Sequence, residues 1–198
     1  MISKKYEDDY RTERVVEDDG RIVNKAVYIG PYYMHTAGRA EVALTKKLCL
    51  PVVILLWVLF AAVFVQNGAA PRQLWVSALF LFSAIPLVYI TWACISLVIS
   101  HAPFNRETSD DLSLKYHKVT IVFSAFTGAA ALAGAAVCLF TGTFELPGDL
   151  MYLLGNAVSA GLGLLLYSRR KSFETTEVSR YSEVFAELMA EKEAKTKK

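Results

Sequence analysis

Acidic and basic side chains are absent from four long stretches of this 198-residue chain. The first stretch, Leu48–Val65, reads LCLPVVILLWVLFAAVFV and contains no charge, amide or glycine. As a helix it reaches about 27 Å, close to the thickness of the hydrocarbon core of a bilayer. Because a helix satisfies its own backbone hydrogen bonds, such a segment is stable in lipid. We therefore expect Leu48–Val65 to span a membrane.

These absences argue against several classes of function. Ion-coupled carriers and proton relays use charged or histidine side chains within the membrane, and the four stretches have none. Haem held between the helices would need histidines there too, but His35, His101 and His117 all lie outside the stretches. The three cysteines form no ligand or redox spacing. We expect no cofactor, no metal site and no catalytic residue.

A basic stripe is also missing. The net charge is only +2, so nucleic acid is not an expected partner. What the chain has instead is apolar sequence, with three further uncharged stretches at Gln73–Ser100, Val119–Phe140 and Leu150–Tyr167. Together with the first, they predict a bundle of four membrane-spanning helices. Pro86, near the middle of the second stretch, should kink its helix.

Polar sequence flanks the four stretches. Thr12–Val16 and Arg21–Ile29 predict the two strands of a β-hairpin, because β-branched residues surround a turn-forming segment. Ala37–Lys47 predicts a helix that runs into the first span, with Thr36 as its N-cap. In the loop between the second and third spans, Thr108–Asp111 has the composition of a helix start.

A helical stripe follows the last span. It consists of Val178, Tyr181, Phe185 and Leu188, and its spacing predicts an amphipathic helix. We divide the chain into an N-terminal segment (1–47), a four-helix domain (48–168) and a C-terminal helix with a basic tail (169–198). The predicted fold is an all-α membrane protein: a four-transmembrane-helix bundle with an N-terminal β-hairpin and a C-terminal amphipathic helix, both on the cytoplasmic side.

Basic residues near the spans predict the orientation. Only Arg72 lies in the two short loops. The other side of the bundle would carry the basic residues Arg39, Lys46, Lys47, Arg106, Lys115, Lys118, Arg169, Arg170 and Lys171. Because cytoplasmic loops are enriched in lysine and arginine, we expect a multi-pass protein of the cell (inner) membrane with both termini cytoplasmic.

Small residues predict how the last two helices pack. Gly155, Ser159 and Gly163 follow one another at four-residue spacing, so they share one face of the fourth span. The third span offers Ser124 and Gly128. Small side chains let helix backbones approach closely in lipid. We expect the third and fourth helices to pack through these five residues.

Two features have both a structural and a functional interpretation. Asn156 is the deepest amide, and it either lines a polar path or makes a hydrogen bond to the third span. The aromatic cluster Tyr28, Tyr32 and Tyr33 either docks a partner or lipid headgroups, or buries the hairpin against the nearby helices. Phe185 in the C-terminal stripe has the same two interpretations.

The sequence therefore predicts a small integral membrane protein without catalytic activity. We expect a scaffold or regulatory subunit that binds a partner protein through its cytoplasmic segments. The alternative is a transporter or channel subunit whose pathway forms on oligomerisation. A scaffold should have a dry core of small residues, whereas a conduit needs a continuous polar track past Asn156. The expected partners are the lipid bilayer and either another protein or further copies of this chain.

Overall fold

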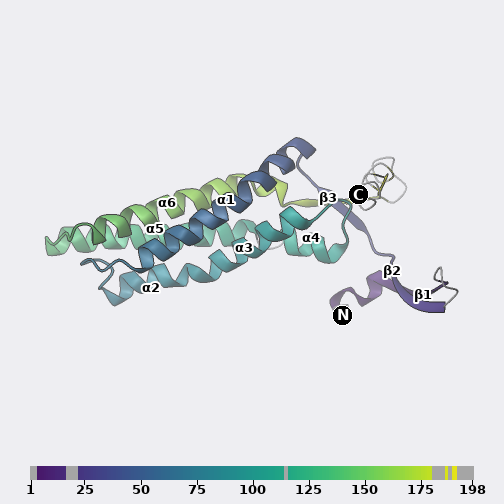
Figure 1. Ribbon diagram of the computed structural model, residues 1–198, viewed down its shortest axis with the longest axis horizontal. Helices are drawn as coiled ribbons and strands as arrows, with labels where there is room; N and C mark the ends of the chain where they lie inside the picture. Colours follow the sequence, from purple (N-terminus) through teal and green to yellow (C-terminus); the bar gives the residue numbers. More distant parts are fainter. Residues whose placement is uncertain (1–3, 17–21, 114–115, 180–185, 187–188, 191–198) are drawn as a thin grey trace.

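The computed structural model describes residues 4–16, 22–113, 116–179, 186 and 189–190. Four long helical segments lie along one another as an elongated bundle, and the strands gather beyond one end of it (Figure 1). This end is called the capped end below, and the opposite one the far end. In chain order the elements are η1 (Lys4–Asp9), β1 (Tyr10–Val16), β2 (Ile22–Tyr28), β3 (Tyr32–His35), α1 (Arg39–Phe64), α2 (Leu74–Phe82), α3 (Ala84–Ile99), α4 (Arg106–Ser113), α5 (Tyr116–Thr141), α6 (Gly148–Ser168), η2 (Arg170–Ser172) and β4 (Thr175–Val178).

Four helical segments are long and apolar enough to cross a membrane. They are Arg39–Phe64, Leu74–Ile99, Lys118–Thr141 and Gly148–Ser168. Only 22% to 39% of their most apolar windows is buried within the protein, so most of this surface needs lipid or another chain to cover it. The prediction of four such helices is confirmed, and they fit a multi-pass membrane protein.

Two small antiparallel sheets lie at the capped end. Strand β1 pairs with β2 from Tyr10 opposite Tyr28 to Val16 opposite Ile22, which confirms the predicted hairpin. Strand β3 does not extend that hairpin. It pairs instead with β4, so that the second sheet joins the start of the chain to its end.

The C-terminal segment differs from its prediction. Val178, expected on a helical stripe, lies in β4 opposite Tyr32. The β-branched pair Thr175 and Thr176 begins this strand, and such residues favour extended backbone. The remaining stripe residues, Tyr181, Phe185 and Leu188, lie outside the described residues.

Two helices begin at other residues than predicted. The N-cap of α1 is Gly38 and not Thr36; the N–H of Thr36 is bonded to the carbonyl of Glu174 beside the second sheet. Helix α4 begins before Thr108. The Asn105 carboxamide oxygen accepts hydrogen bonds from the Thr108 amide (3.3 Å) and hydroxyl (2.7 Å), so Asn105 supplies the cap.

The second apolar segment is interrupted where the sequence predicts a kink. Helix α2 ends at Phe82 and α3 begins at Ala84. Pro86 has no N–H to offer the preceding turn. The buried Ser83 lies at the break, and its hydroxyl donates a hydrogen bond of 2.6 Å to the carbonyl of Phe80.

The interior of the bundle contains two apolar clusters. One lies toward the capped end and includes Leu97, Phe123 and Phe173. The other includes Phe80 and Tyr152. The ring of Tyr116 stacks on that of Phe173, which follows the last long helix, so the first cluster also anchors the chain that leads into β4.

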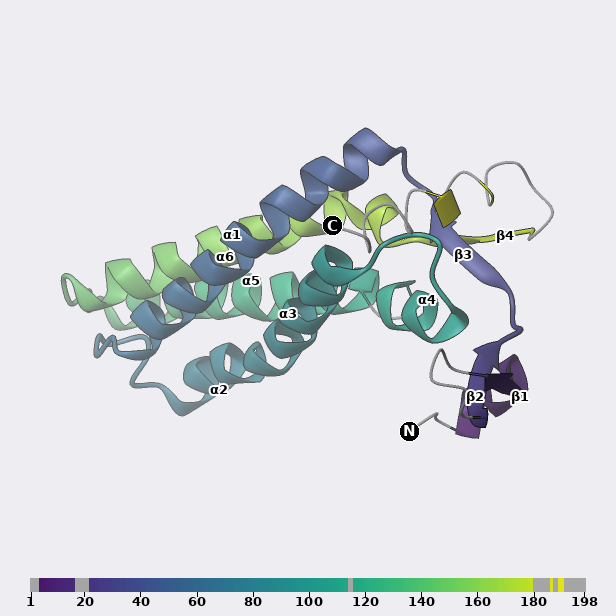
Figure 2. The same cartoon turned by 45° about the vertical axis from the view of Figure 1, so that its right-hand side comes forward.

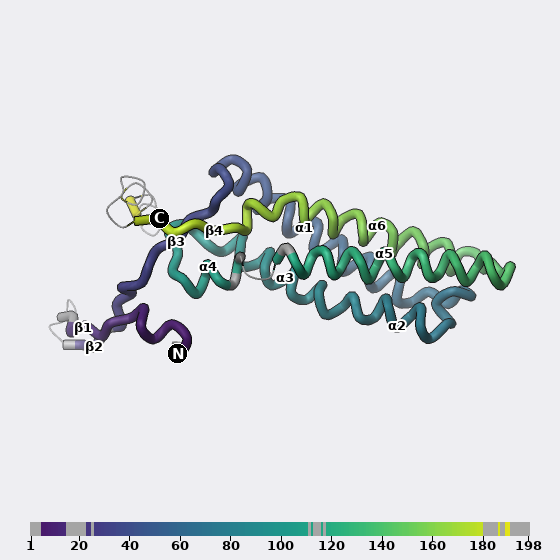
Figure 3. Tube along the Cα trace, turned by 180° about the vertical axis from the view of Figure 1, so that it is seen from behind, coloured from purple at the N-terminus to yellow at the C-terminus, as the bar shows by residue number. Residues whose placement is uncertain are grey.

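The small residues of α6 face two different neighbours. Helices α5 and α6 lie side by side along their length (Figure 3), and a Cβ atom at Gly163 would overlap the Ser124 hydroxyl and lie 3.0 Å from Cδ1 of Phe123. A Cβ at Gly128 would meet only Ala160, at 3.9 Å. Gly155 faces α1, where a Cβ would overlap the side chain of Val63. The buried Ser159 lies between these positions.

Glycine 163 and glycine 161 offer a matched test of this packing. Gly163→Leu should force α5 and α6 apart and lower the unfolding free energy by about 1–3 kcal/mol, as in overpacked cores. Gly161→Leu should be neutral or stabilising, because a Cβ there meets nothing within 4 Å and leucine has the higher helix propensity. Thermal unfolding in detergent ranks the two variants. Equal midpoints would contradict the close contact at Gly163.

Candidate functional site

The strands and α4 form a structure that closes one end of the bundle, and we name β1–β4 together with α4 the cap. Figure 2 shows β3 and β4 beside α4, with the hairpin β1–β2 beyond them. The Tyr33 N–H donates to the carbonyl of Phe104 at 2.9 Å, and the Phe104 N–H donates back at 3.1 Å. The buried hydroxyls of Thr45 and Ser172 share a hydrogen bond of 2.9 Å. These bonds tie β3 to the segment before α4, and they tie α1 to η2, which follows α6.

The hairpin is fixed to α4 at its base. The Asn105 side-chain amide donates to the Tyr10 hydroxyl at 3.0 Å, and the Arg106 guanidinium lies 4.0 Å from the Asp9 carboxylate. The 3₁₀ helix before the hairpin adds a contact through Lys5, which forms an ion pair with Asp110. These three contacts at the base of the hairpin are all polar.

The Asp110 carboxylate receives two hydrogen bonds from this segment. Lys5 donates one at 2.5 Å and the Tyr6 hydroxyl another at 2.9 Å. Burial acts in the opposite direction, but these bonds hold the pKa of Asp110 below its usual value. The carboxylate is therefore charged at neutral pH and anchors the start of the described chain to α4.

The predicted aromatic cluster lies at the same base. The Tyr28 hydroxyl donates to the carbonyl of Pro31 at 2.7 Å and accepts from the Arg106 N–H at 2.9 Å. Its ring meets those of Tyr10 and Tyr32 edge to face, each with centroids 5.2 Å apart. All of these rings are half-buried. Tyr28 and Tyr32 thus face the segment between α3 and α4, whereas Phe185 lies outside the described residues.

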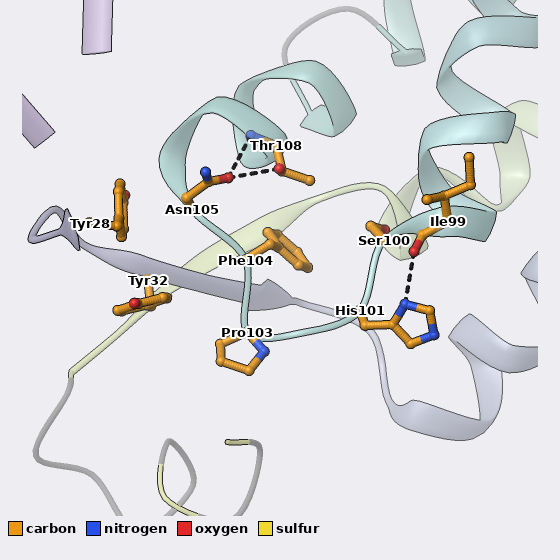
Figure 4. Close-up of a pocket in the computed structure, with 9 residues that line it drawn as sticks. All are labelled: Tyr28, Tyr32, Ile99, Ser100, His101, Pro103, Phe104, Asn105 and Thr108. Atoms are coloured by element: carbon orange, nitrogen blue, oxygen red, sulfur yellow. Dashed lines mark hydrogen bonds between the residues drawn. The ribbon is translucent and has the colours of Figure 1, made fainter. Parts of the chain in front are cut away.

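A cavity of about 440 Å³ opens between the hairpin base and the segment that joins α3 to α4 (Figure 4). Tyr28 and Tyr32 line one side, and residues 99–101 and 103–105 line the other with Thr108. A second cavity of about 320 Å³ is lined by Trp92, Ile95 and Ser96 of α3. The two cavities share Ile99, Ser100 and Thr108 as lining residues, so they adjoin.

His35 is the last residue of β3, and its side chain is half-buried. Its ring meets that of Phe104 edge to face, and its Nδ1 is buried without a hydrogen-bond partner. Burial lowers the pKa of His35 to about 4; the nearby charge of Lys46 acts in the same direction, and a hydrogen bond with the Ser172 backbone opposes it. His35 is therefore neutral at physiological pH.

Polar residues inside the bundle bond mainly to their own helices. The buried hydroxyls of Thr120, Ser124 and Thr127 each donate to a carbonyl one turn earlier in α5. The Asn156 amide donates to the Tyr152 carbonyl at 2.9 Å in its own helix α6. The Asn156 Oδ1 is buried and has no hydrogen-bond partner.

The far end is held together by one buried carboxylate. Asp149 accepts hydrogen bonds from the backbone N–H groups of Ala70 at 2.8 Å and Glu145 at 2.7 Å. A Cβ at Gly68 would overlap this carboxylate, which explains why a glycine lies there. Glu145 also forms an ion pair of 2.9 Å with Arg72. Asp149 thus joins the two short loops and has a clear structural role.

The described residues contain no group of three or more histidine, cysteine or acidic side chains that could hold a metal. No known protein family, curated protein or solved structure matches this chain. The cavities and the hairpin surface therefore provide the only guide to function within the described part of the chain.

The environment of His35 predicts that stability depends on pH. Its pKa of about 4 is lower than the ordinary 6.5, so the unfolded chain binds the proton more tightly and stability falls as the pH drops from about 6.5 toward 4. Because a shift of one pKa unit corresponds to about 1.36 kcal/mol, the unfolding free energy falls by up to about 3 kcal/mol. His35→Phe keeps an aromatic ring beside Phe104 and should flatten this dependence in unfolding measurements at pH 7 and pH 4.5. The control His101→Phe, at an exposed position, should leave it unchanged; the same slope in both variants would contradict the assignment.

Proposed function

We propose that this chain is a non-catalytic scaffold or regulatory subunit of the cell (inner) membrane, whose cap faces the cytoplasm and binds a partner protein. The observation that carries the proposal is the position of the hairpin β1–β2, which extends away from the bundle and is attached at its base (Figures 1 and 2). A two-stranded hairpin is marginally stable in water by itself. A partner that covers it would supply the missing contacts.

The surface of the hairpin supports this proposal. On β1 the side chains from Arg11 to Arg14 are exposed, and on β2 those of Val23, Asn24 and Ala26 are exposed. The strand edges also carry backbone groups that can pair with an added strand. Tyr28 and Tyr32 are engaged at the base, so we assign partner contact to the distal hairpin and anchoring to these tyrosines.

The bundle interior favours a scaffold over a conduit. A conduit needs polar groups that face a continuous path, but the buried α5 hydroxyls are bonded to their own backbone. Gly163 brings α5 and α6 too close to admit a side chain between them. The Oδ1 of Asn156 is the one buried side-chain atom without a hydrogen-bond partner in the described long helices. A single such atom does not form a polar path that leads to either end of the bundle.

The charge distribution supports the orientation. At the far end, Arg72 is paired with Glu145. The described basic residues near the capped ends of the long helices include Arg39, Lys46, Lys47, Arg106, Lys118, Arg169, Arg170 and Lys171. Under the positive-inside rule, the capped end faces the cytoplasm.

Reporter fusions test the orientation. After Lys198, a reporter enzyme that is active only in the cytoplasm should be active, and one that is active only after export should be inactive. A reporter inserted at the exposed Thr143, in the far-end loop, should be active only when it is of the exported type. The reverse pattern at either position would overturn the proposed topology.

Photo-crosslinking in intact cells tests partner binding. A photoreactive residue in place of Thr12 should give a discrete adduct with another protein, because this side chain is exposed on the distal hairpin. The same residue in place of Thr143 serves as the control and should give none. Ala26→Asp should remove the adduct, because the exposed Ala26 lies opposite Thr12 and the change places a charge on the same face of the hairpin. Equal adducts from both positions, or none from Thr12, would contradict the proposed role of the hairpin.

A further inference from the structure

We propose that the two adjoining cavities at the capped end form a binding site for a membrane phospholipid with an ammonium headgroup, such as an ethanolamine lipid. The proposal rests on the membrane placement of α3 and does not require that the hairpin bind a partner. Each cavity exceeds the lower limit of about 300 Å³ that is typical of small-molecule sites. Their surfaces change from apolar to polar along the α3 direction, as a phospholipid does.

The smaller cavity suits an acyl chain. It is lined by Trp92, Ile95 and Ile99, which project from the last two turns of α3 and are 65%, 41% and 68% exposed. These side chains belong to a segment apolar enough to span a membrane, so a lipid chain is the occupant that this environment supplies. Ser96 lies among them and leaves the space that the chain would fill.

The junction of the cavities suits a phosphate. Ser100 lines both cavities, and its carbonyl accepts a hydrogen bond of 2.5 Å from the Lys46 ammonium group. A positive charge therefore lies beside the wall where the apolar lining ends. Asn105 adds an amide group, one of whose two N–H bonds is directed to Tyr10. Lysine side chains at the ends of spans commonly reach the headgroup level.

The larger cavity suits an ammonium group. The described residues that line it include no lysine or arginine, so among them a purely anionic headgroup would meet no cation. Instead, the rings of Tyr28 and Tyr32 supply aromatic surfaces that attract cations. His101 bonds through Nδ1 to the Ile99 carbonyl (Figure 4), so in the neutral ring Nε2 is the acceptor. Chain, phosphate and ammonium groups thus match the sequence of surfaces from Trp92 to Tyr28.

Fluorescence quenching tests this site directly. The double variant Trp57→Phe and Trp75→Phe leaves Trp92 as the only tryptophan, in the wall of the smaller cavity. Purified in detergent, this protein is titrated with phosphatidylethanolamine or phosphatidylglycerol carrying a doxyl quencher on the acyl chain. We expect half-maximal quenching at a roughly tenfold lower mole fraction of the ethanolamine lipid. Equal quenching by the two lipids would show ordinary annular contact and overturn the proposal without requiring any cavity variant.

Matched substitutions then locate the site. Added to the single-tryptophan protein, Ser96→Phe fills the smaller cavity and should weaken quenching by the ethanolamine lipid about tenfold. Ser168→Phe makes the same change at an exposed position at the same end of the bundle and should have no effect. Tyr32→Leu should abolish the preference between headgroups while quenching continues. Retained preference in Tyr32→Leu, or equal effects of the two serine variants with unchanged unfolding midpoints, would contradict the assignment.

Discussion

Backbone pairing at Tyr33 joins the beginning, the middle and the end of the chain. Strand β3 pairs with β4 along one edge, and on the other edge Tyr33 exchanges two hydrogen bonds with Phe104. These contacts set where α1 begins, where α3 gives way to α4 and where the chain leaves α6. Because lipid provides no hydrophobic force between helices, such fixed points outside the spans help to determine how the helices meet.

The four long apolar helices and the hairpin could be predicted because their signals are local. Uncharged stretches long enough to cross a bilayer leave few alternatives, and β-branched residues on both sides of a turn indicate a hairpin. The break near Pro86 could be predicted for the same reason, since the missing N–H acts within one turn. Each of these features depends on residues that are neighbours in the sequence.

The β3–β4 sheet and its contacts could not be predicted because they join distant segments. Strand β4 is only four residues long, and Val178 also fits a helical spacing. Its place in a strand depends on its pairing with Tyr32, which is distant in the sequence. Tyr28 and Tyr32 stood out in the sequence, but nothing in it indicated that they face the segment around Phe104. The packing of Gly155 against α1, in place of α5, likewise depends on helix rotation, which a small-residue pattern leaves open.

The two proposed activities of the capped end use one segment of backbone. Residues 99–101 and 103–105 line the cavity, and within this segment Phe104 is bonded to β3 while Asn105 is bonded to the hairpin. Tyr28 belongs to both structures, since its ring lines the cavity and its hydroxyl bonds the start of α4. A lipid that occupies the cavity therefore contacts the residues that hold the base of the hairpin. Because the hairpin is attached through few polar bonds, ordering of this base would also order the surface offered to a partner, and the two bindings would reinforce each other by the same factor.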